Sequence, residues 1–88
     1  MYLHLGLDVI VSETSVIGIF DLDNTTGSHI TRRFLSEAEK SGIVTAVSDE
    51  LPKSFVVCEE DKKSRVYLSQ LSSQTLLKRS ENPLLMQK

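Results

Sequence analysis

The first quarter of the chain holds three short apolar runs, Tyr2–Leu5, Val9–Val11 and Val16–Phe20, separated by polar or glycine-containing breaks. Each run is too short for a helix and rich in β-branched or aromatic residues, so the pattern predicts three consecutive strands. The third run is apolar at every position, which is typical of a strand covered on both faces. A chain of 88 residues has little material for such cover. The opening stretch, Leu3–Leu22, therefore needs a well-placed helix or a second copy of the protein.

The next segment is dense in turn-forming and capping residues and leads into one amphipathic helix. We expect this helix to begin at an N-cap formed by Thr26 or Ser28 and to end near Lys40, with Gly42 as its C-cap. Its apolar stripe recurs at helical spacing and consists of Ile30, Phe34, Leu35 and Ala38. The stripe is narrow, which predicts a helix that packs across one face of a small sheet.

The second half of the chain predicts three more strands and a short final helix. The strands are expected at Ile43–Val47, Lys53–Cys58 and Val66–Ser69. The mostly charged segment Glu59–Arg65 reads as a solvated hairpin loop between the last two of them. The final helix opens at Ser72 and carries two cations in its last turn, which is favourable near a helix C-terminus.

These elements together predict the fold class α/β, in its α+β form. The expected subunit is a small, mostly antiparallel β-sheet with one main helix and a short C-terminal helix. Residues 1–79 form a single domain, and residues 80–88 form a C-terminal tail with no clear pattern, which either frays or docks on a neighbouring subunit.

Composition narrows the class of protein. The apolar fraction of 40% and the charged fraction of 25% are ordinary for a soluble globular domain. The net charge of −2 argues against a uniformly basic nucleic-acid binder but leaves room for a local basic patch. Cys58 is the single cysteine, so no intramolecular disulfide can form. With no targeting segment and no apolar stretch long enough for a membrane span, we expect a cytoplasmic protein.

The residues that usually carry catalysis or bind metals are sparse. His4 and His29 are the two histidines, and neither has a metal-ligand spacing to the other or to Cys58. The chain has no phosphate-binding or dinucleotide-binding glycine loop and no calcium-loop pattern. We therefore expect no catalytic residues, no metal and no cofactor, and we predict that the protein is not an enzyme.

The basic residues are the remaining candidates for a binding site. Arg32 and Arg33 fall near the start of the main helix, and Lys53 stands at the entrance to a strand. Each of them is able to contact phosphate, although solvation and pairing with nearby acids is the simpler interpretation for any single one. Lys62 and Lys63 directly follow three acidic residues, which cancel much of their field within a Debye length of roughly 8–10 Å.

Four stretches of the chain, in this order, resemble the bacterial extracellular matrix regulatory protein family: HLGLDVIVSETSVIGIFD, ITRRFLSEAEKSG, SFVVCEE and RVYLSQLSSQTLLKR. The resemblance covers about residues 1–79. Its local features are an early glycine followed by Ile10-Val11-Ser12, the pair Arg32-Arg33 ahead of the apolar helix residues, and a closing S-x-x-T-L-x-x-R pattern that ends at Arg79.

This resemblance implies a subunit similar in shape to LytTR-type DNA-binding domains, which assembles into a closed homo-oligomeric ring and binds double-stranded DNA to activate biofilm matrix genes. A ring also explains the doubly apolar third strand, because a neighbouring subunit supplies the missing cover. The residues expected at the subunit interface are Val9, Val11, Val16, Ile17 and Ile19. Phosphate contacts that are weak on one subunit accumulate around such a ring.

The chain departs from the DNA-binding RemA branch of the family at the basic positions. That branch carries an arginine after the second strand and an arginine-rich segment before the penultimate strand. These positions fall here on Ser15 and on Leu51–Ser54, where Lys53 alone is positively charged. The triplet Pro52-Lys53-Ser54 is instead similar to the RemB branch. Lys53, Arg32 and Arg33 remain the expected DNA contacts.

Two functions follow from these observations. The first is a DNA-associated transcriptional regulator of extracellular matrix genes that acts as a ring. The second is an interaction module without DNA contact, which works through a partner protein or by mixed assembly with a more basic paralogue. An enzyme or small-ligand protein has no motif in its favour.

Overall fold

The structure is a computed structural model that describes residues 2–7, 9–22 and 29–81. The N-cap expected at Thr26 or Ser28 and the tail from residue 82 onward lie outside these ranges, as do the side chains of residues 29–31, 80 and 81. The described elements, in chain order, are β1 (Tyr2–Gly6), β2 (Val9–Ser12), the 3-10 turn η1 (Glu13–Ser15), β3 (Val16–Asp21), α2 (His29–Lys40), β4 (Val44–Ala46), β5 (Ser54–Glu60), β6 (Lys63–Ser69) and α3 (Ser73–Glu81).

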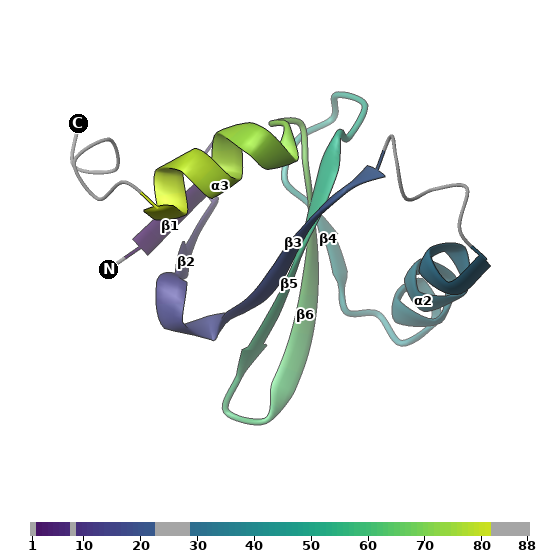
Figure 1. Cartoon of the computed structure of the whole chain (residues 1–88). Coiled ribbons are helices and arrows are strands. Elements are labelled where there is room, and N and C mark those ends of the chain that lie inside the picture. The colour runs from purple at the N-terminus through teal and green to yellow at the C-terminus, as the bar shows by residue number, and fades with distance from the viewer. Residues whose placement is uncertain (1, 8, 23–28, 82–88) are drawn as a thin grey trace.

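The strands form two sheets (Figure 1). β1 and β2 make an antiparallel hairpin, and the other four strands pair in the order β3-β5-β6-β4. The β4–β6 pair is parallel and the remaining pairs are antiparallel. The α+β class with mostly antiparallel strands and two helices is thus confirmed, whereas the expectation of one sheet is wrong.

The separation of the two sheets occurs at η1, where the sequence pattern predicted a polar loop. The Ser15 hydroxyl donates a hydrogen bond of 2.7 Å to the Ser12 carbonyl, and Ser15 is buried. This short turn redirects the chain, so that β3 joins β5 instead of continuing the hairpin. The turn depends on a local serine contact that hydrophobic periodicity does not reveal.

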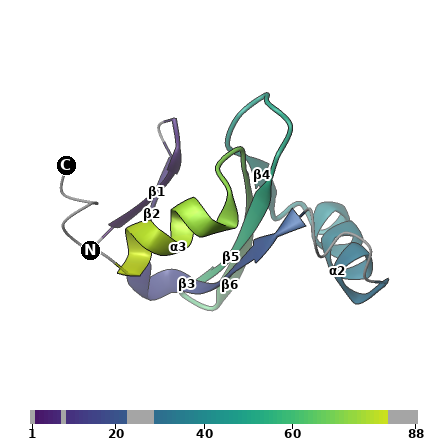
Figure 2. The ribbon, with the colours of Figure 1, turned by 45° about the horizontal axis from the view of Figure 1, so that its top comes forward.

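The four-stranded sheet is covered on both faces by different parts of the chain, as the two views in Figures 1 and 2 show. The hairpin and α3 lie on one side and enclose the hairpin core, which consists of Leu3, Leu5, Val11, Val47, Val56, Cys58 and Leu76. Helix α2 lies on the opposite side, where the helix core consists of Leu22, Ala38, Phe55 and Val66. Successive residues of β5 alternate between these two cores, as the period of two in a strand requires.

Strand β3 forms an edge of its sheet and is covered only in part. Val16 and Ile19 pack against the hairpin core. Ile17 stands at a bulge, where the pairing with β5 shifts by one residue, and its side chain is 63% exposed. Phe20 is 41% exposed. The described part of the chain therefore does not supply the cover on both faces that the apolar sequence of this strand predicts.

The β5–β6 hairpin is longer than predicted. Both strands run into the segment Glu59–Arg65, which was expected to be a loop, and Glu60 pairs with Lys63 across the ladder. The turn itself is confined to Asp61 and Lys62, with φ angles of 53° and 66°. Two successive residues in the left-handed region are typical of a tight hairpin turn, although glycine and asparagine usually occupy it. The segment is solvated, as expected, but it is mostly strand.

The ends of both helices follow local sequence signals. Gly42, with φ of 75°, closes α2: its N–H donates to the Glu39 carbonyl at 3.0 Å, and the Ile43 N–H donates to the Ala38 carbonyl at 3.2 Å. This pair of bonds is a Schellman motif and confirms the predicted C-cap. Ser72 caps α3 by accepting a 3.1 Å hydrogen bond from the Thr75 N–H. No helix in the described ranges is long and apolar enough to cross a membrane.

Candidate functional site

Lys53 is held by its backbone at the start of β5. Its N–H donates to the Ser69 carbonyl at 2.8 Å, and its carbonyl accepts from the Leu22 N–H at 3.0 Å. The next residue, Ser54, is fully buried and donates its hydroxyl to the Leu71 carbonyl at 2.8 Å. These bonds fix the main chain while the Lys53 side chain stays exposed. A positioned, solvated ammonium of this kind suits a phosphate contact.

Arg32 and Arg33 are exposed side chains of α2. The Arg33 guanidinium lies 3.6 Å from the Glu37 carboxylate in an i, i+4 pair that is open to solvent. Such a pair contributes at most a few tenths of a kcal/mol, so Arg33 is able to exchange this partner for a phosphate. Arg32 precedes Leu35 by three residues and Glu39 by seven, which places the three on one face of the helix.

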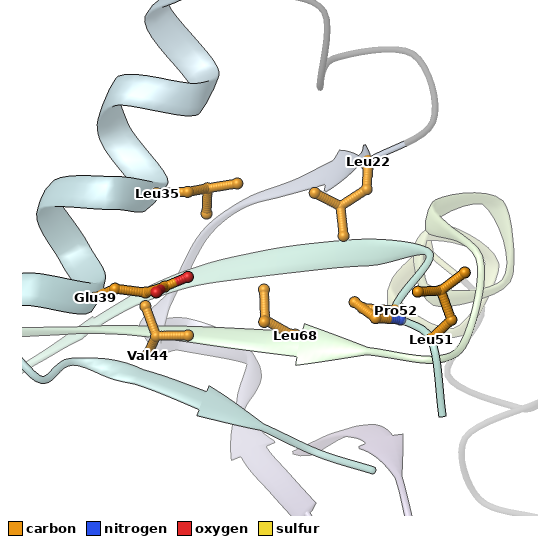
Figure 3. Close-up of a pocket in the computed structure, with 7 residues that line it drawn as sticks. All are labelled: Leu22, Leu35, Glu39, Val44, Leu51, Pro52 and Leu68. Carbon is orange, nitrogen blue, oxygen red and sulfur yellow. The ribbon is translucent and has the colours of Figure 1, made fainter. Parts of the chain in front are cut away.

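A groove of about 340 Å³ opens between α2 and the loop that leads into β5 (Figure 3). One wall comes from α2 and the other from the loop, with the sheet as the floor. Its lining residues are Leu22, Leu35, Glu39, Val44, Leu51, Pro52 and Leu68. All of these are apolar except Glu39. The groove therefore suits apolar side chains, with one carboxylate at its edge.

Two of the three predicted DNA contacts adjoin the groove. Lys53 follows Pro52 in one wall, and Arg32 lies on the same helix face as Leu35 in the other. Arg33 is directed to Glu37 instead. Leu51 is 87% exposed, so an apolar side chain stands where the resemblance led us to expect arginine. The structure thus places cations beside an apolar groove and not in a continuous basic stripe.

Acidic residues accompany these cations. Asp49 and Glu50 directly precede Leu51 and are exposed, and the Glu50 N–H donates to the Ser48 hydroxyl at 2.9 Å. Glu39 stands at the groove. On a subunit with a net charge of −2 this mixture weakens the local positive potential. Any DNA contact therefore depends on a few individual cations.

The residues expected at a subunit interface differ in the solvent exposure of their side chains. Val11 is buried in the hairpin core, and Val9, Val16 and Ile19 are half-buried against it. Ile17 is the member of this set whose side chain is mostly exposed. Of these five residues, Ile17 is therefore the one most accessible to another molecule.

The outer face of the hairpin carries further exposed side chains. Tyr2 is 67% exposed and Ile10 is 51% exposed. His4 pairs with Ile10 across the two strands and shares this outer face, because alternate residues of a strand point the same way. The Arg79 guanidinium donates to the His4 carbonyl at 3.4 Å. This face is thus partly apolar.

Ser15 and Cys58 are both buried and adjoin each other. Burial raises the pKa of the Cys58 thiol above its ordinary value, a hydrogen bond with Ser15 opposes the rise, and the Glu60 carboxylate adds to it. The thiol is therefore a poor nucleophile at neutral pH. Ser15, the position where the resemblance led us to expect an arginine, is unable to reach DNA from this site.

Within the described ranges, no group of three or more histidine, cysteine or carboxylate side chains is arranged to hold a metal ion. Sequence reasoning found the three cations, but it missed the groove. The available signal was Leu51-Pro52, an apolar pair in an otherwise acidic turn. The residues that complete the groove come from α2, β4, β6 and the end of β3, where Leu22 follows the strand, and their proximity depends on tertiary packing.

Comparison with known proteins shows similarity over most of the chain. A family model described as "RemA-like: Extracellular matrix regulatory protein A-like" matches residues 2–79. The chain is 41% identical over 81 residues to "Extracellular matrix regulatory protein B" of Bacillus subtilis (strain 168), which spans 92% of this chain and 91% of that protein. The matched region contains β1 to β6, α2 and most of α3.

Proposed function

Because this chain belongs to the RemA-like family of extracellular matrix regulatory proteins, we propose that it regulates extracellular matrix genes as a DNA-associated, ring-shaped homo-oligomer. The observation that supports DNA contact most is Lys53, whose backbone is fixed on both sides while its ammonium faces solvent. Arg32 and Arg33 on α2 supply further cations. A ring repeats this small set at every subunit, so that weak phosphate contacts add up.

The apolar surface left on one chain supports assembly. Ile17 and Phe20 are exposed on the edge strand β3, and Tyr2 and Ile10 are exposed on the outer face of the hairpin. Each of these two surfaces is a candidate site for contact with another copy of the chain. A subunit of 9.8 kDa also has limited capacity to bury its own apolar surface.

DNA binding is tested by fluorescence anisotropy with a labelled duplex at several salt concentrations. We expect affinity to fall as salt rises, because bound cations displace condensed counterions. Lys53→Glu should weaken binding about tenfold or more per ring. Lys62→Glu at the tip of the β5–β6 hairpin is the matched control and should change affinity little, since Lys62 directly follows the acidic residues Glu59, Glu60 and Asp61. Absence of binding at low salt and high micromolar protein would contradict direct DNA contact.

The second function, an interaction module that acts through a partner protein or a more basic paralogue, is favoured by one observation. Leu51 is 87% exposed beside an apolar groove, on the loop where a DNA-binding surface would be basic. Co-purification of the chain with a basic homologue, combined with no DNA binding by the chain alone, would support this alternative. Salt-dependent DNA binding by the pure chain would count against it.

A further inference from the structure

The groove between α2 and the Leu51–Lys53 loop is an apolar surface that the described part of the chain leaves open. It has about 340 Å³ of space, and its rim residue Leu51 is 87% exposed. On the same sheet face, Phe20 and Phe34 flank Phe55 with ring centroids 5.0 Å and 6.3 Å away. Both outer rings remain about 40% exposed to solvent. A surface of this kind is typical of a docking site for apolar side chains.

We propose that the C-terminal tail of a second copy of this chain, residues 82–88, docks in this groove. The tail has the sequence Asn-Pro-Leu-Leu-Met-Gln-Lys, with three consecutive apolar residues at Leu84, Leu85 and Met86. Its one charged side chain, Lys88, has the sign opposite to that of Glu39 at the groove. The segment and the groove thus match in apolar character, and Glu39 is the charged lining residue that is able to pair with Lys88.

The position of α3 favours a neighbouring chain over the tail's own groove. α3 packs with the hairpin on one side of the four-stranded sheet, whereas the groove lies on the α2 side (Figures 1 and 2). Its last turn is near β1, where Arg79 contacts His4. Seven extended residues span at most about 25 Å. The longest dimension of the molecule is 36 Å, and a path to its own groove would have to pass around the sheet.

A contact between the tail of one copy and the groove of the next joins two different surfaces. Heterologous contacts of this type close into rings or extend into filaments. The inference therefore rests on the proposed ring and specifies which surfaces meet in it. It also gives Leu51 and Pro52 a role as one wall of the docking site.

The test uses two full-length variants, each of which breaks one half of the contact. Leu51→Asp places a charge at the groove rim, and the double change Leu84→Asp/Leu85→Asp places charges in the tail. Leu51 is 87% exposed, so its replacement removes no core side chain. Leu7→Asp is the control, because Leu7 is 70% exposed at the β1–β2 turn. Circular dichroism checks that all variants are folded.

Sedimentation velocity without DNA gives the readout. We expect the wild type and Leu7→Asp to form an assembly and each of the two other variants to sediment as a 9.8 kDa monomer. An equimolar mixture of those two variants should form a species of two copies, because an intact tail then meets an intact groove. Failure of the mixture to associate would overturn the inference, as would wild-type assembly of either variant alone.

Three further outcomes also decide the question. Dissociation by Leu7→Asp but not by Leu51→Asp would move the contact to the hairpin and overturn the inference. Protection of the wild-type groove from hydrogen exchange that Leu84→Asp/Leu85→Asp removes without changing the mass of the assembly would identify docking within one chain, which also overturns it. A monomeric wild type would instead remove the proposed ring itself, so the failure of the two proposals can be told apart.

Discussion

The two faces of the four-stranded sheet are buried to different degrees. In the hairpin core Leu3, Leu5 and Leu76 are fully buried, and the Ser69 hydroxyl donates a buried 2.6 Å hydrogen bond to the Leu5 carbonyl. In the helix core the central Phe55 is buried, but the apolar groove beside it is open. The described part of the chain covers one face completely and leaves the other partly exposed. The exposed face is therefore the one on which we expect a second copy of the chain to bind.

The largest expected effect is the loss of stability on truncating a leucine, which should differ between the two cores. Leu76→Ala in the hairpin core should lower the free energy of unfolding by about 2–5 kcal/mol, since it leaves a cavity in a closed environment. Leu35→Ala at the groove should lower it by about 1 kcal/mol, because Leu35 is only half-buried. Urea denaturation at one protein concentration measures both. Equal losses would contradict the difference between the cores.

Glycine substitutions sharpen the same comparison. Gly6 has a φ of 124°, and an added Cβ would lie 2.8 Å from the Gln70 Oε1 atom, so Gly6→Ala should destabilise the hairpin region by about 2–3 kcal/mol. Gly42 has a φ of 75° but open space around it, and Gly42→Ala should lose about 1 kcal/mol. Thermal unfolding of the two variants tests this order. A larger loss at Gly42 would show that the Gly6–Gln70 approach is unimportant.

The buried serine contact gives the next smaller effect. Ser69 donates to the Leu5 carbonyl and accepts a 3.0 Å hydrogen bond from the Leu71 N–H, so it joins the hairpin to β6. Ser69→Ala should reduce stability by about 1–2 kcal/mol because buried partners lose their bonds. Ser48→Ala, at a solvent-exposed contact, is the control and should stay within about 0.5 kcal/mol. Amide exchange of β1 should rise in the first variant and not in the second.

The smallest effect concerns the Cys58 thiol in the hairpin core. Because burial raises the pKa of the Cys58 thiol in the folded protein, the protonated thiol favours the folded state. This contribution is complete below the pKa of the unfolded thiol and is lost as the pH rises through the folded pKa. A thiol reagent at pH 8 should react at least tenfold more slowly with the folded protein than with the urea-unfolded chain. Equal rates would place Cys58 at an open site.

Local signals explain how much of this fold the sequence predicts. Gly42 and Ser72 mark the ends of two helices through contacts within a few residues, and both were identified correctly. The β5–β6 hairpin was predicted, but its loop was expected to be longer, because Asp61 and Lys62 adopt left-handed angles without glycine. The division into two sheets was missed because Ser69 holds β1 across 64 positions of the chain. Long-range contacts of this kind do not produce a periodic pattern of hydrophobic residues in the sequence.

The candidate site shows the same limit. Lys53, Arg32 and Arg33 were selected by residue type alone, and the structure places them on exposed positions. The groove between them requires Leu22, Leu68 and α2 to converge, and no local pattern predicts that convergence. The half-burial of three of the predicted interface valines and isoleucines also follows from the docking of the hairpin on β3 and β5.

The most direct test of the account is the solution mass of the full-length chain, measured by light scattering from low micromolar to hundreds of micromolar protein. If a second copy completes the exposed face and the copies close into a ring, one species should persist at a fixed multiple of 9.8 kDa across this range. A mass of 9.8 kDa at every concentration would contradict the account, because the apolar face would then remain open on a stable monomer.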